Sequence, residues 1–452
     1  MTRPAHDYLE GNFGPVHEEI TAVDLPVTGT IPAELDGRLI RNGPNPITAP
    51  DPEKYHWFTG DGMVHGVRLR DGKAEWYRNR WVRSAEVAAA LGEPAPPTPY
   101  GDGVPSFAAN TNVVSIAGKT FAIVEAGSPP VELTDELETV GPSNFSGTLE
   151  HPFSAHPKRD PRTGEWHVVA YFWGWGNKIR YMSISADGRV QKVVDVDTPG
   201  GPMVHDMAFT DTYALLFDLP VTFDVDAAMA GAPLPYFWND SYGARIGLLP
   251  RASTATDGSD VRWFDIDPCY FYHPLNAYDL DDGQVVLDAV RYDTMFNKNR
   301  QGPNEGPSRL ERWTIDPAEG KVLESTLDDH LEEFPRLNEA YQGRRNRYGY
   351  GATFGSLDAG GGPAIKHDLV AGTSVEHDYG SGRETLEPVF VAREGAKDED
   401  DGWVISYVYD GTTDRADVVI LDAQDFGGDP VATIQLPVRV PFGFHGNWVP
   451  TP

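Results

Sequence analysis

Apolar and polar residues alternate in short runs along most of the chain. In Val64–Val82, two such runs lie on either side of an Asp-Gly pair, and a similar arrangement returns in Thr111–Gly127. Alternation with a period of two is typical of a β-strand with one buried face, and Asp-Gly suits the tight turn of a β-hairpin. The same strand-like pattern occurs in Glu165–Trp173, Lys178–Asp197, Asp279–Asp293, Arg309–Thr326, Leu386–Arg393 and Trp403–Gln424.

Helical patterns are few and short. A period of about 3.6 residues extends over no more than about two turns, in Val87–Glu93, Asp226–Ala232 and Leu327–Glu333. Hairpins without long helices exclude a parallel α/β fold and leave a sandwich, a barrel or a propeller. Because the hairpins recur from one end of the chain to the other, they favour an all-β propeller, in which many small sheets hide their edges. We expect residues 1–452 to form a single domain.

Composition and charge narrow the classes of partner. The chain has 68 Asp and Glu against 37 Lys and Arg, a net charge of −31. Such a charge repels phosphate backbones, so it argues against a nucleic-acid partner. A single cysteine, Cys269, excludes an intramolecular disulfide and a metal site with several cysteines.

The sequence also predicts where the protein works. The N-terminal residues show no signal-peptide pattern, and no apolar run of about eighteen residues occurs. We therefore expect a cytoplasmic protein without a transmembrane segment, for which a transient contact with a membrane or a lipid carrier stays open. No pattern predicts an oligomeric state.

Four of the thirteen histidines differ from the rest in their surroundings. His156, His205, His273 and His445 each lie beside aromatic or apolar residues, near the expected end of a strand. A buried imidazole needs a partner, because an unsatisfied buried polar group costs about 1–3 kcal/mol. One interpretation is four separate core histidines bonded to the backbone. The other is one metal site, because the inner strands of different propeller blades converge on the axis.

Four neutral imidazoles suit a divalent metal of borderline softness, and iron, zinc, copper and nickel all remain candidates by ligand type. A metal-bound imidazole commonly donates its other ring N–H to a carboxylate. Three glutamates lie in apolar surroundings where a carboxylate is hard to explain: Glu125 in FAIVEAG, Glu333 in EEFPRL and Glu387 in TLEPVFV. They are candidates for these partners, and the alternative is three surface glutamates on edge strands.

These segments resemble the carotenoid cleavage oxygenases, a family of non-haem iron(II) enzymes on a seven-bladed β-propeller. The resemblance begins at Gly37–Pro46 and Trp57–Gly66 and covers almost the whole chain. It continues in the family's order through ANTNVV, FSAHPKRDPRTGE, GGPMVHDMAFT, HPLNAYD, EFPR, EPVFV, DDGWVISYVYD and PFGFHGNW. The resemblance implies seven blades, with a cap of loops and short helices over the iron-bearing face.

The resemblance also implies roles for eight residues. The four histidines match the ligands of one Fe(2+) per chain. The three glutamates match carboxylates bonded to His205, His273 and His445, in that order. His156 has no such partner in the family's pattern, and Thr111 matches a residue near the open coordination position.

The implied activity is that of a dioxygenase. It cleaves a conjugated C=C double bond with O2 into two carbonyl products, incorporates both oxygen atoms and needs no organic cofactor. The expected substrate is a hydrophobic conjugated molecule, a carotenoid or apocarotenoid, and the alternative is a phenolic stilbene or phenylpropenoid. A propeller that has lost activity and acts as a binding scaffold is the alternative from another class, although none of the four histidines is missing.

Two residues are expected to contact the substrate. Phe58 would line the cavity for either substrate class. Val124 stands where stilbene-cleaving members carry a phenol-binding lysine, and its apolar side chain favours a polyene. The nearest lysine, Lys119, lies at a predicted hairpin turn. The segment Leu215–Trp238 would form an apolar mouth, or else a strand and a loop packed on the cap.

Overall fold

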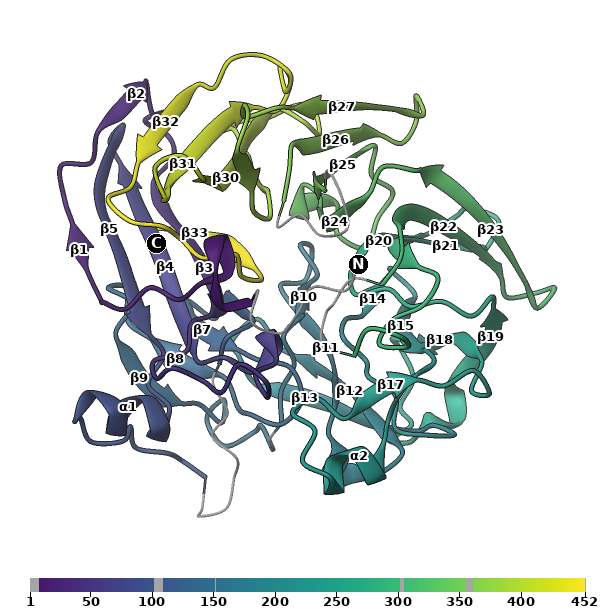
Figure 1. The fold of residues 1–452 in the computed structure, drawn as a ribbon. Helices are drawn as coiled ribbons and strands as arrows, with labels where there is room; N and C mark the ends of the chain where they lie inside the picture. The colour runs from purple at the N-terminus through teal and green to yellow at the C-terminus, as the bar shows by residue number, and fades with distance from the viewer. Residues whose placement is uncertain (1–7, 101–108, 151, 301–304, 355–360, 452) are drawn as a thin grey trace.

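The computed structural model describes residues 8–100, 109–150, 152–300, 305–354 and 361–451. In these ranges seven antiparallel sheets of four or more strands stand as blades around a common axis (Figure 1). The expectation of an all-β, seven-bladed propeller is therefore confirmed.

Blades 2 to 6 are each built from four strands in chain order, and the first strands of blades 4, 5 and 6 contact their neighbours around the axis. Blade 2 contains β6 (Asn112–Ile116), β7 (Lys119–Ile123), β8 (Val131–Leu133) and β9 (Thr139–Pro142). Blade 3 contains β10 (Lys158–Arg159), β11 (Trp166–Tyr171), β12 (Lys178–Ile184) and β13 (Val190–Asp197). Blade 4 contains β14 (Ala208–Phe209), β15 (Tyr213–Asp218), β18 (Ala244–Pro250) and β19 (Arg262–Ile266).

The next two blades repeat this plan. Blade 5 contains β20 (Pro274–Asp279), β21 (Val285–Tyr292), β22 (Ser308–Asp316) and β23 (Lys321–Asp328). Blade 6 contains β24 (Glu332–Arg336), β25 (Tyr348–Thr353), β26 (Ala364–Asp368) and β27 (Thr373–His377).

Blades 1 and 7 combine strands from the two ends of the chain and so close the ring. In blade 1, β33 (Gly446–Pro450) pairs with β3 (Gly37–Pro44), and in blade 7, β2 (Val27–Gly29) pairs with β32 (Ala432–Gln435). The other strands of blade 1 are β1 (Thr21–Ala22), β4 (Gly62–Arg70) and β5 (Lys73–Trp81). Those of blade 7 are β28 (Arg383–Thr385), β29 (Val389–Ala392), β30 (Gly402–Asp410) and β31 (Arg415–Asp422).

The predicted hairpins form where the sequence provides the turn residues. Between β4 and β5, Asp71 and Gly72 both have positive φ (49° and 70°), as a type I′ turn requires. Ala117 and Gly118 adopt the same conformation (52° and 76°) between β6 and β7.

Two of the three expected helices are present. Helix α1 (Ala85–Leu91) begins after Ser84, whose hydroxyl accepts the Val87 N–H. Helix α2 (Val225–Met229) begins after Asp224, which caps Ala227 in the same way. The helix expected at Leu327–Glu333 was wrong. That segment contains the end of β23 and the start of β24, because pairing with the neighbouring strands of blades 5 and 6 outweighs its weak helical pattern.

Several short elements lie outside the blades. They include α2 and a two-stranded sheet of β16 (Val221–Phe223) and β17 (Tyr236–Trp238). The 3₁₀ helices are η2 (Gly11–Phe13), η3 (Trp57–Thr59), η4 (Trp173–Trp175), η5 (Gly258–Asp260) and η6 (Glu339–Tyr341).

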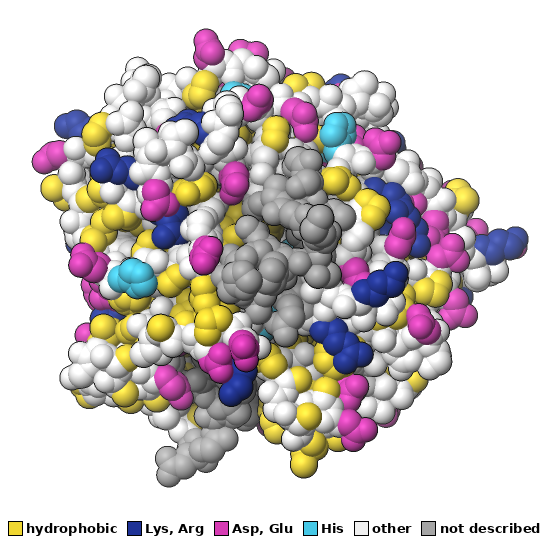
Figure 2. All heavy atoms as spheres, viewed as in Figure 1, with side chains coloured by type: hydrophobic (Ala, Val, Ile, Leu, Met, Phe, Trp, Pro, Cys, Tyr) yellow, Lys and Arg dark blue, Asp and Glu magenta, His cyan; other side chains and the backbone are white. Residues whose placement is uncertain are grey.

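The outer surface carries the acidic excess of the sequence. On the face shown in Figure 2, acidic side chains are spread around the rim rather than gathered in one patch. No helix in the described ranges is long and apolar enough to cross a membrane.

Candidate metal centre

Four histidines occupy similar positions in four blades, one to three residues before the strand nearest the axis. His273 directly precedes β20, and His445 directly precedes β33. His156 and His205 lie two and three residues before β10 and β14. All four side chains are buried. Histidines that are far apart in sequence therefore meet at the centre of the ring.

The ring nitrogens of the four histidines face one another. The Nε2 atoms of His156 and His205 are 3.0 Å apart, and those of His205 and His273 are 3.2 Å apart. One nitrogen from each of the four lies within 4.8 Å of the others. Two imidazoles bound at right angles, about 2.1 Å from one ion, place their nitrogens about 3.0 Å apart. The set fits one divalent metal, and the alternative of four separate core histidines does not describe it.

Carboxylates fix the outer nitrogens of three histidines. The Nδ1–H of His445 donates to Glu387 at 2.9 Å, and that of His273 donates to Glu333 at 2.6 Å. His205 Nδ1 makes a short contact with Glu125. Each carboxylate sets the tautomer that leaves Nε2 free to bind a metal.

All seven blades contribute to this centre. The histidines come from blades 1, 3, 4 and 5, and the glutamates come from blades 2, 6 and 7. In blade 2, the residue directly before the inner strand is Thr111. Its carbonyl accepts the backbone N–H of His445 at 3.0 Å.

The electrostatics favour neutral rings at His156 and His445, whereas Glu125 outweighs burial and raises the pKa of His205. Burial lowers the pKa of His445 to about 3, and it lowers the pKa of His156 well below its ordinary value, with the neighbouring histidines adding to the effect. Burial opposes ionisation of Glu387, but Arg336 and His445 outweigh it and lower the pKa of that carboxyl. The Nε2 lone pairs of His156 and His445 are thus available to a cation.

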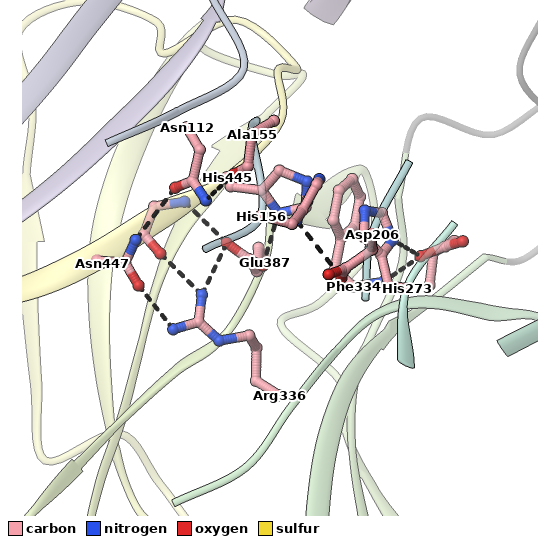
Figure 3. A network of polar contacts seen from close by, with 12 residues as sticks. Asn112, Ala155, His156, Asp206, His273, Phe334, Arg336, Glu387, His445 and Asn447 are labelled. Atoms are coloured by element: carbon pink, nitrogen blue, oxygen red, sulfur yellow. Dashed lines mark hydrogen bonds and ion pairs between the residues drawn. The ribbon is translucent and has the colours of Figure 1, made fainter. Parts of the chain in front are cut away.

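Four contacts of the centre were not predicted. The Asp206 carboxylate, fully buried, lies 3.5 Å from His156 Nδ1 and accepts a hydrogen bond from Lys158 at 2.8 Å. The Arg336 guanidinium lies 3.2 Å from Glu387 (Figure 3). The hydroxyl of Tyr171 donates to Glu125. Asp206 had a signal in the sequence, since an acid in the apolar segment VHDMAF follows a candidate ligand directly, whereas Tyr171 had none.

A large apolar cavity of about 1020 Å³ ends at this centre. His205, His273 and His445 reach its inner end. Its wall includes Thr111, which was expected near the open coordination position, and Phe58 and Val124, which were expected to contact the substrate. Its aromatic residues are Tyr8, Phe13, Trp57, Phe58, Tyr171, Trp173, Phe223, Tyr236, Tyr272, Tyr292, Phe334, Phe354, Phe442 and Phe444.

The segment Leu215–Trp238 divides between core and cavity. Its first residues form β15 in the buried core of blade 4, and later residues from Phe223 to Tyr236 line the cavity. Lys119 lies away from the cavity, with its side chain 59% exposed and ion-paired with Glu132. A different lysine, Lys298, lines the cavity wall and was not predicted.

The same family appears in comparisons with known proteins. The model of the family described as retinal pigment epithelial membrane protein matches residues 13–450. A carotenoid cleavage oxygenase of Mycobacterium tuberculosis is 46% identical over 98% of this chain and 97% of its own length. Carotenoid 9,10(9′,10′)-cleavage dioxygenase 1 of Arabidopsis thaliana is 35% identical over 99% of this chain and 90% of its own.

Comparison with solved structures indicates the same family. The lignostilbene dioxygenase of Pseudomonas brassicacearum has a TM-score of 0.87 and 26% identity, and the match covers 98% of both chains. The cobalt-substituted apocarotenoid oxygenase of Synechocystis also has a TM-score of 0.87 and 26% identity, over 99% of both chains. This chain therefore belongs to the carotenoid cleavage oxygenase family, and it is a dioxygenase.

Proposed function

We propose that the chain binds one Fe(2+) through His156, His205, His273 and His445 and cleaves a conjugated C=C double bond of a carotenoid or apocarotenoid with O2. The observation that supports this is the convergence of four histidine nitrogens at a centre where three of the histidines form the inner end of a large aromatic cavity. The two products are carbonyl compounds, and together they contain both oxygen atoms.

In this reaction the protein would hold the metal and position the substrate. When bound, the iron would supply the binding and activation of O2. Four neutral imidazoles would add no negative charge to a bound dication. The carboxylates of Glu125, Glu333 and Glu387 supply negative charge through their hydrogen bonds to the outer nitrogens of three of these imidazoles. The apolar cavity excludes water and holds the double bond beside the histidines. The substrate is therefore already positioned for reaction at the metal.

The wall beside Glu125 supports a polyene. Val124 provides no hydrogen-bond donor or acceptor there, and Ala126 follows on the same wall. A cavity of about 1020 Å³ with many aromatic residues suits a long apolar chain, because most of its surface leaves water on binding.

The alternative substrate is a phenolic stilbene, and one residue favours it. Lys298 lines the cavity and its ammonium could hold a phenolate, as a charge-assisted hydrogen bond contributes about 1.5–3 kcal/mol. Lys298 is largely exposed, however, and its segment lies in the loop after β21, whereas Val124 directly precedes Glu125. We therefore place the polyene first.

The test is a combined analysis of metal and products. Purified protein is loaded with ferrous salt under argon, desalted and analysed for metal, and is then supplied with an apocarotenal under ¹⁸O₂. We expect one iron per chain and two aldehydes that each gain one labelled oxygen before exchange with water. Stoichiometric binding of zinc with rejection of iron, or release of products without label, would contradict the proposal.

A further inference from the structure

A second cavity, of about 580 Å³, also reaches the histidine cluster. Its buried end is formed by His156, His273 and His445. Its other end is lined by exposed turn residues such as Gly118 and Ala186, so it opens to solvent. We call it the axial cavity. Within the described ranges, His156 lines the axial cavity and is absent from the wall of the apolar one.

The two cavities approach the centre from opposite ends of the blade 2 strands. Thr111 and Val124, at one end of the β6–β7 hairpin, line the apolar cavity. Ala117 and Gly118, in its turn, line the axial cavity. A strand of five residues is about 16 Å long, so the axial cavity is a short passage from the surface to the histidines.

The walls of the axial cavity carry charges deep below the surface. Asp206, with a side chain 0% exposed, binds Lys158, whose side chain is 19% exposed. Arg336 also lines the cavity and pairs with Glu387 at 3.2 Å (Figure 3). Its guanidinium pairs at 2.9 Å with the exposed Glu339 as well. These ion pairs place charged groups along the axial cavity, from its exposed end to the outer nitrogens of His156 and His445.

We propose that the axial cavity is the route by which a hydrated divalent cation enters and leaves the histidine cluster, apart from the apolar cavity that admits the substrate. This inference rests on the metal centre proposed above. A hydrated dication keeps favourable contacts along walls of carboxylates and amides, whereas an aromatic wall would strip its water without replacement. The net charge of −31 also raises the concentration of cations at the surface.

One cysteine introduced at Ser115 can plug the passage after folding. Ser115 lies in β6 and lines the axial cavity. The natural Cys269 is buried, and burial raises the pKa of its thiol to about 12, so it does not compete for a maleimide at neutral pH. The matched control is Ala228→Cys in α2, which lines the apolar cavity.

The experiment follows the uptake of Co²⁺ by metal-free protein, from its visible absorption and from metal analysis after desalting. Labelled Ser115→Cys should take up Co²⁺ at least about tenfold more slowly than the same unlabelled variant, equal to about 1.4 kcal/mol of added barrier. The final stoichiometry should remain one per chain. Labelled Ala228→Cys should load at the wild-type rate.

Two results would overturn the route. Uptake by labelled Ser115→Cys at the unlabelled rate would show that the axial cavity is not used. Slow uptake by labelled Ala228→Cys alone would assign the route to the apolar cavity. If wild-type protein binds no Co²⁺ and no Fe²⁺, the metal centre itself fails and the route fails with it, so the two failures are distinguishable.

Discussion

The centre depends on which nitrogen of each histidine carries the proton. Glu125, Glu333 and Glu387 each hold an Nδ1 and leave an Nε2 for the metal. An isosteric amide keeps the size of the carboxylate but removes its charge, and it can also turn its NH₂ group toward the ring.

Glu333→Gln and Glu387→Gln are therefore expected to weaken iron binding or the rate by about 10–100-fold. Competition with a ferrous chelator measures the affinity, and O2 consumption measures the rate. Glu132→Gln is the control, because this carboxylate lies away from the histidines and is ion-paired with the exposed Lys119. Equal iron affinity in all three variants would make the buried glutamates structural only.

A second prediction at this scale concerns Val124. Val124→Lys places an ammonium beside an apolar substrate, and the cost of its desolvation should lower turnover of an apocarotenal about tenfold or more. Lys119→Met, at the exposed start of β7, should change that turnover by less than about threefold. Rates for both variants are compared on an apocarotenal and on a 4-hydroxystilbene. Efficient cleavage of the stilbene alone by the wild type would reverse our order of substrates.

Sequence alone predicted the histidines and glutamates better than their neighbours. A histidine before an inner strand and a glutamate in an apolar run leave a visible pattern, because both need a partner that the local sequence lacks. Tyr171 and Lys158 leave no such pattern. A buried tyrosine is ordinary in a β-strand, and a lysine is ordinary near a turn, so their contacts arise only from how the blades are placed.

At the scale of elements, the hairpins could be predicted from the sequence, but the contacts between strands of neighbouring blades could not. Turn residues specify a hairpin locally, whereas Leu327–Glu333 becomes two strands through partners in blades 5 and 6. One cluster joins these blades. His367 in β26 lies 2.9 Å from Glu332 in β24 and 3.5 Å from Asp328, the last residue of β23.

This cluster predicts a dependence of stability on pH. Burial disfavours the charged ring, but Glu332 and Asp328 outweigh it and raise the pKa of His367 to about 9. A raised pKa stabilises the fold fully below about pH 6.5, and this stability is lost as the pH rises through about 9. The free energy of unfolding should thus fall by about 1–3 kcal/mol over that window.

Denaturant unfolding of the metal-loaded protein at pH 6.5 and 9 measures the fall. His367→Gln should remove most of it, because the amide stays neutral throughout. His330 is exposed and shares Asp328, which raises its pKa as well, so His330→Gln measures the smaller part of the fall that this second ring contributes. An unchanged difference between the two pH values in His367→Gln would place the titration elsewhere.

At the scale of the whole molecule, ring closure and the metal centre share a strand. Gly446 begins β33, pairs with Arg41 of β3 and donates its N–H to Glu387 at 2.8 Å. A Cβ at this position would lie 2.6 Å from the carbonyl oxygen of Ile40. Real side chains do not tolerate so short a contact with backbone, so β33 would have to move.

Gly446→Ala is therefore expected to destabilise the fold by about 1–3 kcal/mol and to speed loss of iron, because His445 moves with the strand. Thermal unfolding and the rate of iron transfer to a chelator measure the two effects. Gly427→Ala is the control, since its Cβ would make only an ordinary contact of 3.5 Å with Val375. A variant with a lower melting temperature but an unchanged rate of iron loss would separate ring closure from metal retention.

The position of β33 in the sequence also determines when the metal centre can form during synthesis of the chain. The ribosome delivers His445 after every other strand of the propeller, and 172 residues after His273. At about 5–20 residues per second, this interval lasts roughly 9–34 seconds. A nascent chain therefore holds three of the four histidines and an open ring. Iron capture on the proposed centre follows translation, and a product of premature termination lacks the last ligand together with the closing strand.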